Sequence, residues 1–142
     1  MTPSQIALVR GSFAKLAPSH ESVAARFYEN LFDIDPSLRH LFACCDMRAQ
    51  CAKLVVAIGT IVNALDDLEP ILEGIRDLGR RHIRYGVQER HYVSCGKALL
   101  ETLHECFGPA FEGKLCEAWA AAYAIVSGAM IEAARSPTPK AA

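Results

Sequence analysis

The sequence lacks the patterns that identify several large classes of protein. It has six cysteines but no Cys-x-x-Cys pair, and no grouping of Cys and His at the spacing of structural zinc sites. Few segments alternate apolar and polar residues, which argues against an extensive β-sheet. Acidic and basic residues are interspersed and balance to a net charge of −1. This balance gives no electrostatic reason to expect nucleic acid or an anionic membrane as a partner.

Long apolar runs are also missing. No basic segment leads into an apolar run at the start, MTPSQIALV, and no uncharged span approaches the ~20 residues needed to cross a bilayer. We therefore expect a cytoplasmic protein without a membrane partner. The 142 residues suffice for one domain that buries a substantial core and encloses a small cofactor. A second catalytic domain, such as a flavin or nicotinamide domain, is not expected.

The cysteines are expected to be small buried residues with free thiols, as is usual in a reducing compartment. Cys44, Cys45 and Cys51 lie close together in the sequence. A disulfide across such a short loop is geometrically possible, but the sequence alone gives no basis for inferring one.

Apolar residues recur at helical spacing along most of the chain, with turn signals between the segments. Thr2 and Gln5 are expected to form a capping box around Pro3, while Ser19 and Asp35 are expected to cap the next two helices. The expected helices are about 3–16, 20–34, 36–42, 48–66, 70–85, 89–106 and 111–134. They predict an all-α domain over residues 1–135, followed by a frayed tail at 136–142.

One of these helices ends its apolar face with a histidine. Ile71, Ile75, Leu78 and His82 fall on one stripe, while arginines occupy the other side. A buried imidazole must hydrogen-bond, sit neutral in a tight pocket or bind a metal, because leaving it unpaired costs roughly 1–3 kcal/mol. By periodicity alone, an ordinary structural role is more common than a ligand role.

Three further residues raise the interest of this histidine. Gln50 leads the apolar face of the preceding helix, so it would point at His82 if the two faces oppose each other across a gap. Tyr28 brings a hydroxyl to the same interior, and Phe42 lies at the bend that follows Pro36. Each also has an ordinary interpretation: Tyr28 as a core residue, Gln50 as a solvated amide and Phe42 as plain packing.

Together these segments resemble the globins, in particular the single-domain bacterial haemoglobins of the Vitreoscilla and Hell's Gate types and the globin domain of flavohaemoglobins. The matching segments are RFYENLF with Tyr28, PSLRHLF with Phe42, Gln50 ahead of KLVVAIG, LGRRHIRYGV with His82, and HYVSCGKALL with Tyr92. They follow one another in the family's order over nearly the whole chain. The resemblance implies the three-over-three globin fold enclosing haem b, iron protoporphyrin IX.

The resemblance also implies a role for each matching residue. His82 would bind the iron, with its second ring nitrogen donating to the Leu78 carbonyl. Arg80, Arg81 and Arg84 are mostly expected on a solvated helix face, but one of them, with Arg81 as the candidate, would pair with a haem propionate. The implied haem contacts on this proximal side are His82, Leu78, Arg81, Val87 and Tyr92. The distal pocket and the ring packed on the haem would be Tyr28, Gln50, Leu54 and Phe42.

One position departs from the family pattern. Flavohaemoglobin-like globins add a proximal tyrosine and a glutamate, which push electron density onto the iron. Tyr92 matches the tyrosine, whereas the glutamate position corresponds to Ala134, and the nearby Glu132 points elsewhere on the helix. The departure argues against strongly peroxidase-like chemistry.

The implied function is reversible binding of oxygen, and of NO and CO, by five-coordinate haem in a monomer or homodimer. Bound oxygen carries partial negative charge, so donors from Tyr28 and Gln50 would each add roughly 0.5–1.5 kcal/mol and retain it tightly. Such a protein could also convert nitric oxide to nitrate, with Tyr28 and Gln50 as catalytic residues, provided that a separate reductase returns the electron.

Two other hypotheses belong to different classes. The first is a redox or gas sensor with six-coordinate iron, bound by Gln50, Tyr28 or His40, in which the clustered thiols tune the loop. The second is a helical interaction module that binds no cofactor.

Overall fold

The computed structural model describes residues 1–135, and within this range the chain forms helices and no strand. Six are α-helices and three are short 3-10 helices. The elements are α1 (Pro3–Lys15), η1 (Ala17–Ser19), α2 (His20–Ile34), η2 (Pro36–Phe42), α3 (Met47–Asn63), α4 (Glu69–Arg84), α5 (Glu89–Phe107), η3 (Gly108–Phe111) and α6 (Lys114–Arg135). The predicted all-α class is confirmed, and the expected tail at 136–142 lies outside the described residues.

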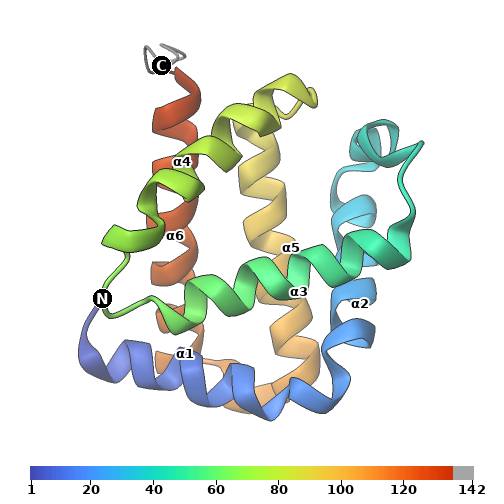
Figure 1. The fold of residues 1–142 in the computed structure, drawn as a ribbon. Coiled ribbons are helices and arrows are strands. Elements are labelled where there is room, and N and C mark those ends of the chain that lie inside the picture. The colour runs from blue at the N-terminus through green and yellow to red at the C-terminus, as the bar shows by residue number, and fades with distance from the viewer. Residues whose placement is uncertain (136–142) are drawn as a thin grey trace.

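The helices pack in crossed pairs. α4 lies across α6 and α2 packs on α5, while α3 runs across α2 and α1 packs on both α6 and α3 (Figure 1). α3 and α4 are not among the closely packed helix pairs in residues 1–135. The helices that carry Gln50 and His82 instead pack mainly on other helices, α3 on α2 and α1 and α4 on α6.

The starts of the helices follow local capping chemistry in most cases. Thr2 Oγ1 accepts from the Gln5 N–H at 3.1 Å, and Gln5 Oε1 accepts from the Thr2 N–H at 3.0 Å, so the predicted capping box is confirmed. Asp35 also caps as predicted, accepting from the Ser37 N–H. The prediction for Ser19 was wrong, because η1 runs directly into α2 and the Ser19 side chain makes no cap bond.

α3 is shifted toward the N-terminus relative to the predicted range of 48–66. It begins at Met47 because the Asp46 carboxylate accepts from two N–H groups of the first turn. It ends at Asn63 because Arg10, from α1, donates to the Val62 and Asn63 carbonyls at 3.1 and 2.8 Å. A distant side chain therefore satisfies carbonyl groups that a longer helix would have used.

The last helix begins at Lys114 rather than at residue 111. Phe111 instead ends η3, where its side chain is 2% exposed, and Gly113 has a φ of +71° that favours glycine. α6 is long and apolar enough, by length and composition only, to span a membrane. It packs against α4, α1 and α5, and its Trp119 side chain is buried and donates to Ser12 Oγ at 2.9 Å. We therefore interpret α6 as a core helix.

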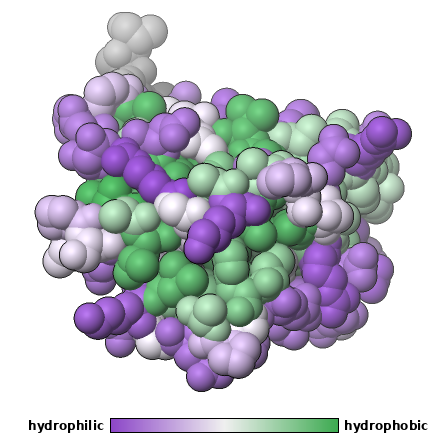
Figure 2. All heavy atoms as spheres, turned by 90° about the horizontal axis from the view of Figure 1, so that it is seen from below, coloured by the Kyte–Doolittle hydropathy of each residue, from purple (hydrophilic) through white to green (hydrophobic). Residues whose placement is uncertain are grey.

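The side of the molecule on which α1 lies is apolar at its centre. Seen from below, green apolar residues form a broad patch with polar residues around it (Figure 2). Leu8 of α1 is 36% exposed, and it is the large apolar side chain of α1 that reaches the surface. Apolar atoms make up much of any protein surface, so this patch does not by itself identify a binding site.

α4 and α6 cross so closely that a side chain at Gly79 has no room. A Cβ atom there would lie 2.3 Å from the Met130 carbonyl oxygen. We expect Gly79→Ala to lower the free energy of unfolding by about 2 kcal/mol, because backbone has to move. Gly74→Ala on the same helix meets no atom within 4 Å and is expected to stabilise by about 0.5–1 kcal/mol. Urea unfolding of both variants checks this, and equal effects would contradict the close crossing.

The first turn of α5 depends on a buried neutral histidine. His91 Nδ1 accepts from the Gln88 N–H at 2.9 Å, and Nε2 lies 3.9 Å from the Asp35 carboxylate. Burial lowers the His91 pKa below its ordinary value of 6.5, the charge on Arg90 lowers it further, and Asp35 opposes both. The native state therefore resists the protonation that the unfolded chain accepts.

This shift predicts a pH dependence of stability. Above the unfolded pKa of His91 both states are neutral, and as pH falls through the lower native pKa the unfolded state is favoured because it binds the proton first. We expect the loss of unfolding free energy between about pH 7.5 and about pH 5 to be smaller in His91→Gln than in wild type. His104→Gln, at an exposed site, is the control; an identical loss in both variants would refute the assignment.

Candidate functional site

The site begins with a hydrogen bond between α2 and α3. Tyr28 is 5% exposed, and its phenol oxygen accepts from Gln50 Nε2 at 3.1 Å. Burial raises the pKa of Tyr28 to about 12, although the bond from Gln50 opposes the shift. The phenol is therefore protonated at neutral pH. Because Gln50 supplies the hydrogen of this bond, the hydroxyl hydrogen of Tyr28 stays available for another acceptor.

Aromatic and apolar side chains surround this pair. η2 places Phe42 against the Tyr28 ring, with centroids 5.4 Å apart in an edge-on arrangement. The Phe32 ring contacts both of these rings. Leu54, one turn after Gln50 on α3, packs on the same cluster. Phe42 and Leu54 are only half-buried, so each leaves apolar surface uncovered.

His82 lies near the end of α4. Its Nδ1 is 2.7 Å from the Leu78 carbonyl oxygen, which fixes Nδ1–H as a donor and leaves the lone pair on Nε2. Burial lowers the His82 pKa; the Leu78 bond opposes this, and the charge on exposed Arg81 lowers it further. A neutral imidazole with an oriented ring and a free Nε2 is the form that binds metals.

Tyr92 of α5 lies beside the histidine. The two rings stack with centroids 6.4 Å apart, and the buried Tyr92 hydroxyl has no hydrogen-bond partner among the described residues. Ala134 stands where the resemblance would place a glutamate, while Glu132 is exposed. Ala134 has no carboxylate to offer the Tyr92 hydroxyl.

The other residues near His82 differ in whether they are free to contact a bound group. The Val87 N–H donates to the His82 carbonyl at 3.0 Å, so the turn after α4 is tied to the histidine. Arg80 forms ion pairs with Glu73 and Asp77 at 3.2 and 3.0 Å. Arg81 is exposed and forms no ion pair within residues 1–135, so it remains available for an acidic group.

These residues fit haem better than a bare metal ion. Within the described chain no group of three or more His, Cys, Asp or Glu side chains could hold a metal. A metal at His82 must therefore bring its other ligands with it, as a porphyrin does. Phe42, Leu54 and Val87 are half-buried and the buried Tyr92 hydroxyl has no partner among the described residues, and an apolar group bound at His82 could use both features.

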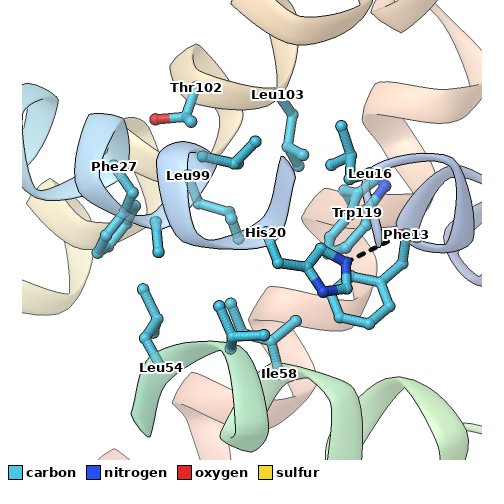
Figure 3. A pocket seen from close by; sticks show the side chains of 13 residues that line it. Phe13, Leu16, His20, Phe27, Leu54, Ile58, Leu99, Thr102, Leu103 and Trp119 are labelled. Atoms are coloured by element: carbon cyan, nitrogen blue, oxygen red, sulfur yellow. Dashed lines mark hydrogen bonds between the residues drawn. The ribbon is translucent and has the colours of Figure 1, made fainter. Parts of the chain in front are cut away.

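A small cavity lies next to Leu54, among α1, α2, α3 and α5. It has a volume of about 50 Å³ and apolar walls, and Leu54 and Ile58 point into it from α3 (Figure 3). At one side His20 stacks on Phe13, with centroids 4.4 Å apart. His82 does not line this cavity, nor does it line the groove of about 460 Å³ that runs between α2 and α3 beside Tyr28 and Cys51. Both spaces are therefore separate from the proximal histidine.

The thiols and one tyrosine complete the surroundings. All six cysteines are free; Cys44 and Cys45 are exposed, and Cys51 is buried beside Tyr28.

The sequence patterns did not single out Cys95 or Tyr123 as neighbours of the site. Burial raises the pKa of the Cys95 thiol to about 11, and the Tyr123 hydroxyl donates to the Tyr92 carbonyl at 2.6 Å. The signal for Tyr123 was its place four residues after Trp119, on the same side of α6.

A neutral His82 with a free Nε2 on α4, and a Tyr28–Gln50 pair bordered by apolar side chains on α2 and α3, are the kinds of residue with which a helical protein holds haem. The sequence model of the globin family matches residues 25–130. The chain is 30% identical to neuroglobin of Danio rerio over 136 residues, covering 87% of this chain and 86% of that protein. The chain belongs to the globin family.

Two further comparisons extend this result. The chain is 27% identical to a flavohemoprotein of Vibrio cholerae over 134 residues, which is 93% of this chain but 34% of that protein. It thus spans about a third of the length of the flavohemoproteins that it matches. An engineered carbene transferase, derived from a putative nitric oxide dioxygenase of Rhodothermus marinus, superimposes with a TM-score of 0.83. It is 25% identical, with 96% of this chain and 95% of that chain covered. The predicted globin fold is confirmed.

Proposed function

We propose that this globin binds haem b and uses it to hold oxygen reversibly, with NO and CO as further ligands. Haem b supplies a ferrous iron with one coordination position open to a diatomic gas. His82 Nε2 is the proposed iron ligand. Arg81 is the proposed partner of a propionate, because it is exposed beside His82 and has no ion pair within the described residues.

The observation that carries the proposal is the direction of the bond between Gln50 and Tyr28. Gln50 donates to the phenol oxygen, so the Tyr28 hydrogen is free to point at a gas molecule between α3 and α4. With a pKa of about 12, Tyr28 keeps this hydrogen at neutral pH. Oxygen, which becomes partly negative as a ligand, is favoured by such a donor over carbon monoxide, which does not.

A spectrum tests the proposal and its main alternative together. The dithionite-reduced protein is expected to show five-coordinate ferrous haem, and then a shift of the absorption bands when carbon monoxide is added. A colourless protein that takes up no haemin would support the cofactor-free interaction module instead. Six-coordinate low-spin iron before any gas is added would support the sensor, with His40 or a distal residue as the second ligand.

A conditional enzymatic activity follows from the same pocket. Oxygen and nitric oxide combine to nitrate at the cost of one electron from ferrous haem, so each further turnover needs an electron from a reductase. Two similarities support this part: the flavohemoproteins and the putative nitric oxide dioxygenase described above. We propose that Tyr28 and Gln50 hold oxygen in place for this reaction.

Single and repeated turnover distinguish the activity from plain binding. Mixing the oxygenated protein with one equivalent of nitric oxide is expected to yield one nitrate and ferric haem. Further equivalents are expected to yield nitrate only when a reductase and its reductant are present. Release of oxygen without nitrate formation would refute the dioxygenase activity and leave the gas-binding proposal intact.

A further inference from the structure

The turn that joins α4 to α5 exposes apolar side chains. Ile83, Tyr85 and Val93 are 54%, 61% and 61% exposed. They are three of the six large apolar side chains that are exposed in the described chain, and they fall within eleven residues. We call this segment, residues 83–93, the α4–α5 corner; it lies at the end of the molecule away from α1 (Figure 1).

The same corner is positively charged. Arg84 forms no ion pair within residues 1–135, and neither does Arg81 just before the corner. Arg90 lies 3.6 Å from the Asp35 carboxylate, while Glu89, the acidic residue of the corner, is already paired with Arg135. Exposed aromatic and aliphatic side chains surrounded by arginines are the composition of protein interfaces.

The corner also contains an exposed aromatic side chain, Tyr85, that lies against His82. The Tyr85 ring lies 6.0 Å from the His82 ring, and it is itself at the surface. A protein that covers Tyr85 therefore comes within one aromatic ring of His82. The apolar patch on the face of α1 in Figure 2 carries no proposal, because nothing among the described residues shows what would cover it.

We propose that the α4–α5 corner docks an acidic electron-transfer flavoprotein, the reductase on which repeated turnover depends. The inference rests on the proposed function, because only a haem that is oxidised in each cycle needs a donor. One electron leaves the partner's reduced flavin and converts ferric haem to ferrous, with no bond formed or broken. The arginines orient the acidic partner and speed its approach, while the apolar side chains hold it.

A second copy of the chain is a poorer occupant of this surface. Self-association through the corner would bring Arg84, and Arg81 just before the corner, close to the same residues of a second copy without acidic partners, which is unfavourable. An acidic protein removes this penalty and pairs the two free arginines. Charge complementarity therefore favours an acidic protein over a second copy of the chain.

The test uses a flavodoxin as an acidic flavoprotein probe. Oxidised flavodoxin is titrated into the 15N-labelled, carbon monoxide-loaded globin, and amide shifts are expected to concentrate at residues 81–93. The double variant Ile83→Ser/Arg84→Glu is expected to weaken the Kd at least about tenfold. The matched control Ile125→Ser/Lys15→Glu, which changes the same residue classes on α6 and α1, is expected to stay within about twofold.

A kinetic arm tests the electron transfer itself. Reduction of the ferric globin by flavodoxin hydroquinone is expected to slow as salt rises and to slow in the double variant, whereas reduction by dithionite stays the same in both. Shifts elsewhere on the globin, an equal Kd in the double variant or absence of binding would overturn the docking surface. Wild-type dimers that the double variant abolishes would overturn it in favour of self-association. If the wild-type protein binds neither haem nor carbon monoxide, the proposed function itself is contradicted.

Discussion

His82→Ala is expected to leave the purified protein with less than about a tenth of the wild-type haem. No cluster of metal-binding side chains within residues 1–135 can replace the imidazole, and the lost bond is worth several kcal/mol, of which 1.4 kcal/mol already corresponds to about a tenfold change in affinity. The ratio of haem to protein absorbance measures the effect. The exposed His104 provides the control, since His104→Ala is expected to keep its haem.

A rescue experiment separates a ligand from a structural residue. In His82→Gly, free imidazole is expected to enter the vacated space and restore haem binding. If imidazole restores the wild-type ratio of haem to protein, the His82 side chain is the iron ligand. If His82→Ala keeps its haem, or if imidazole changes nothing while the variant remains folded, the proximal assignment is wrong.

Tyr28→Phe is expected to speed oxygen dissociation about tenfold, which corresponds to the loss of one hydrogen bond worth about 1.4 kcal/mol. The ring stays in place against Phe42, so only the donor is removed. Stopped-flow displacement of oxygen by carbon monoxide measures the rate. Carbon monoxide dissociation is expected to change little, because that ligand gains little negative charge.

Tyr92→Phe is the matched control, since it removes a phenol hydroxyl from the opposite side of the site. That hydroxyl has no partner among the described residues, so the oxygen off-rate is expected to stay within about threefold of wild type. Equal off-rates in Tyr28→Phe and wild type would mean that the Tyr28 hydrogen points elsewhere.

Gln50 is expected to act on bound oxygen both directly and through Tyr28. Gln50→Leu removes a donor and also the bond that holds the phenol, so its effect overlaps with that of Tyr28→Phe. We expect the double variant to lose less than the sum of the two single losses, because residues in contact are not additive. A strictly additive result would mean that the 3.1 Å bond between the two side chains has no part in oxygen binding.

Local chemistry made much of the fold predictable. The capping box of Thr2 and Gln5 and the Asp35 cap depend on residues within one turn of each other, and both are present. The end of α3 depends on Arg10, which lies more than fifty residues away in the sequence. The close crossing at Gly79 likewise depends on Met130. Contacts of this kind have no local signal.

The candidate site divides in the same way. The bond from His82 to the Leu78 carbonyl joins residues one helical turn apart, so helical spacing predicts it. The bond between Tyr28 and Gln50 joins two helices; the apolar pattern brought both residues to one interior, but it gave no direct contact between them. Cys95 and Tyr123 were missed because their importance comes from what α5 and α6 bring beside them.

A crystal structure of the haem-loaded, oxygen-bound protein tests the central claim most directly. The account predicts iron held by His82 Nε2 on the α4 side, with Tyr28 Oη and the Gln50 amide within hydrogen-bond distance of the gas on the α3 side. Iron bound by another protein side chain, such as His40, or a gas ligand that neither Tyr28 nor Gln50 approaches, would contradict it.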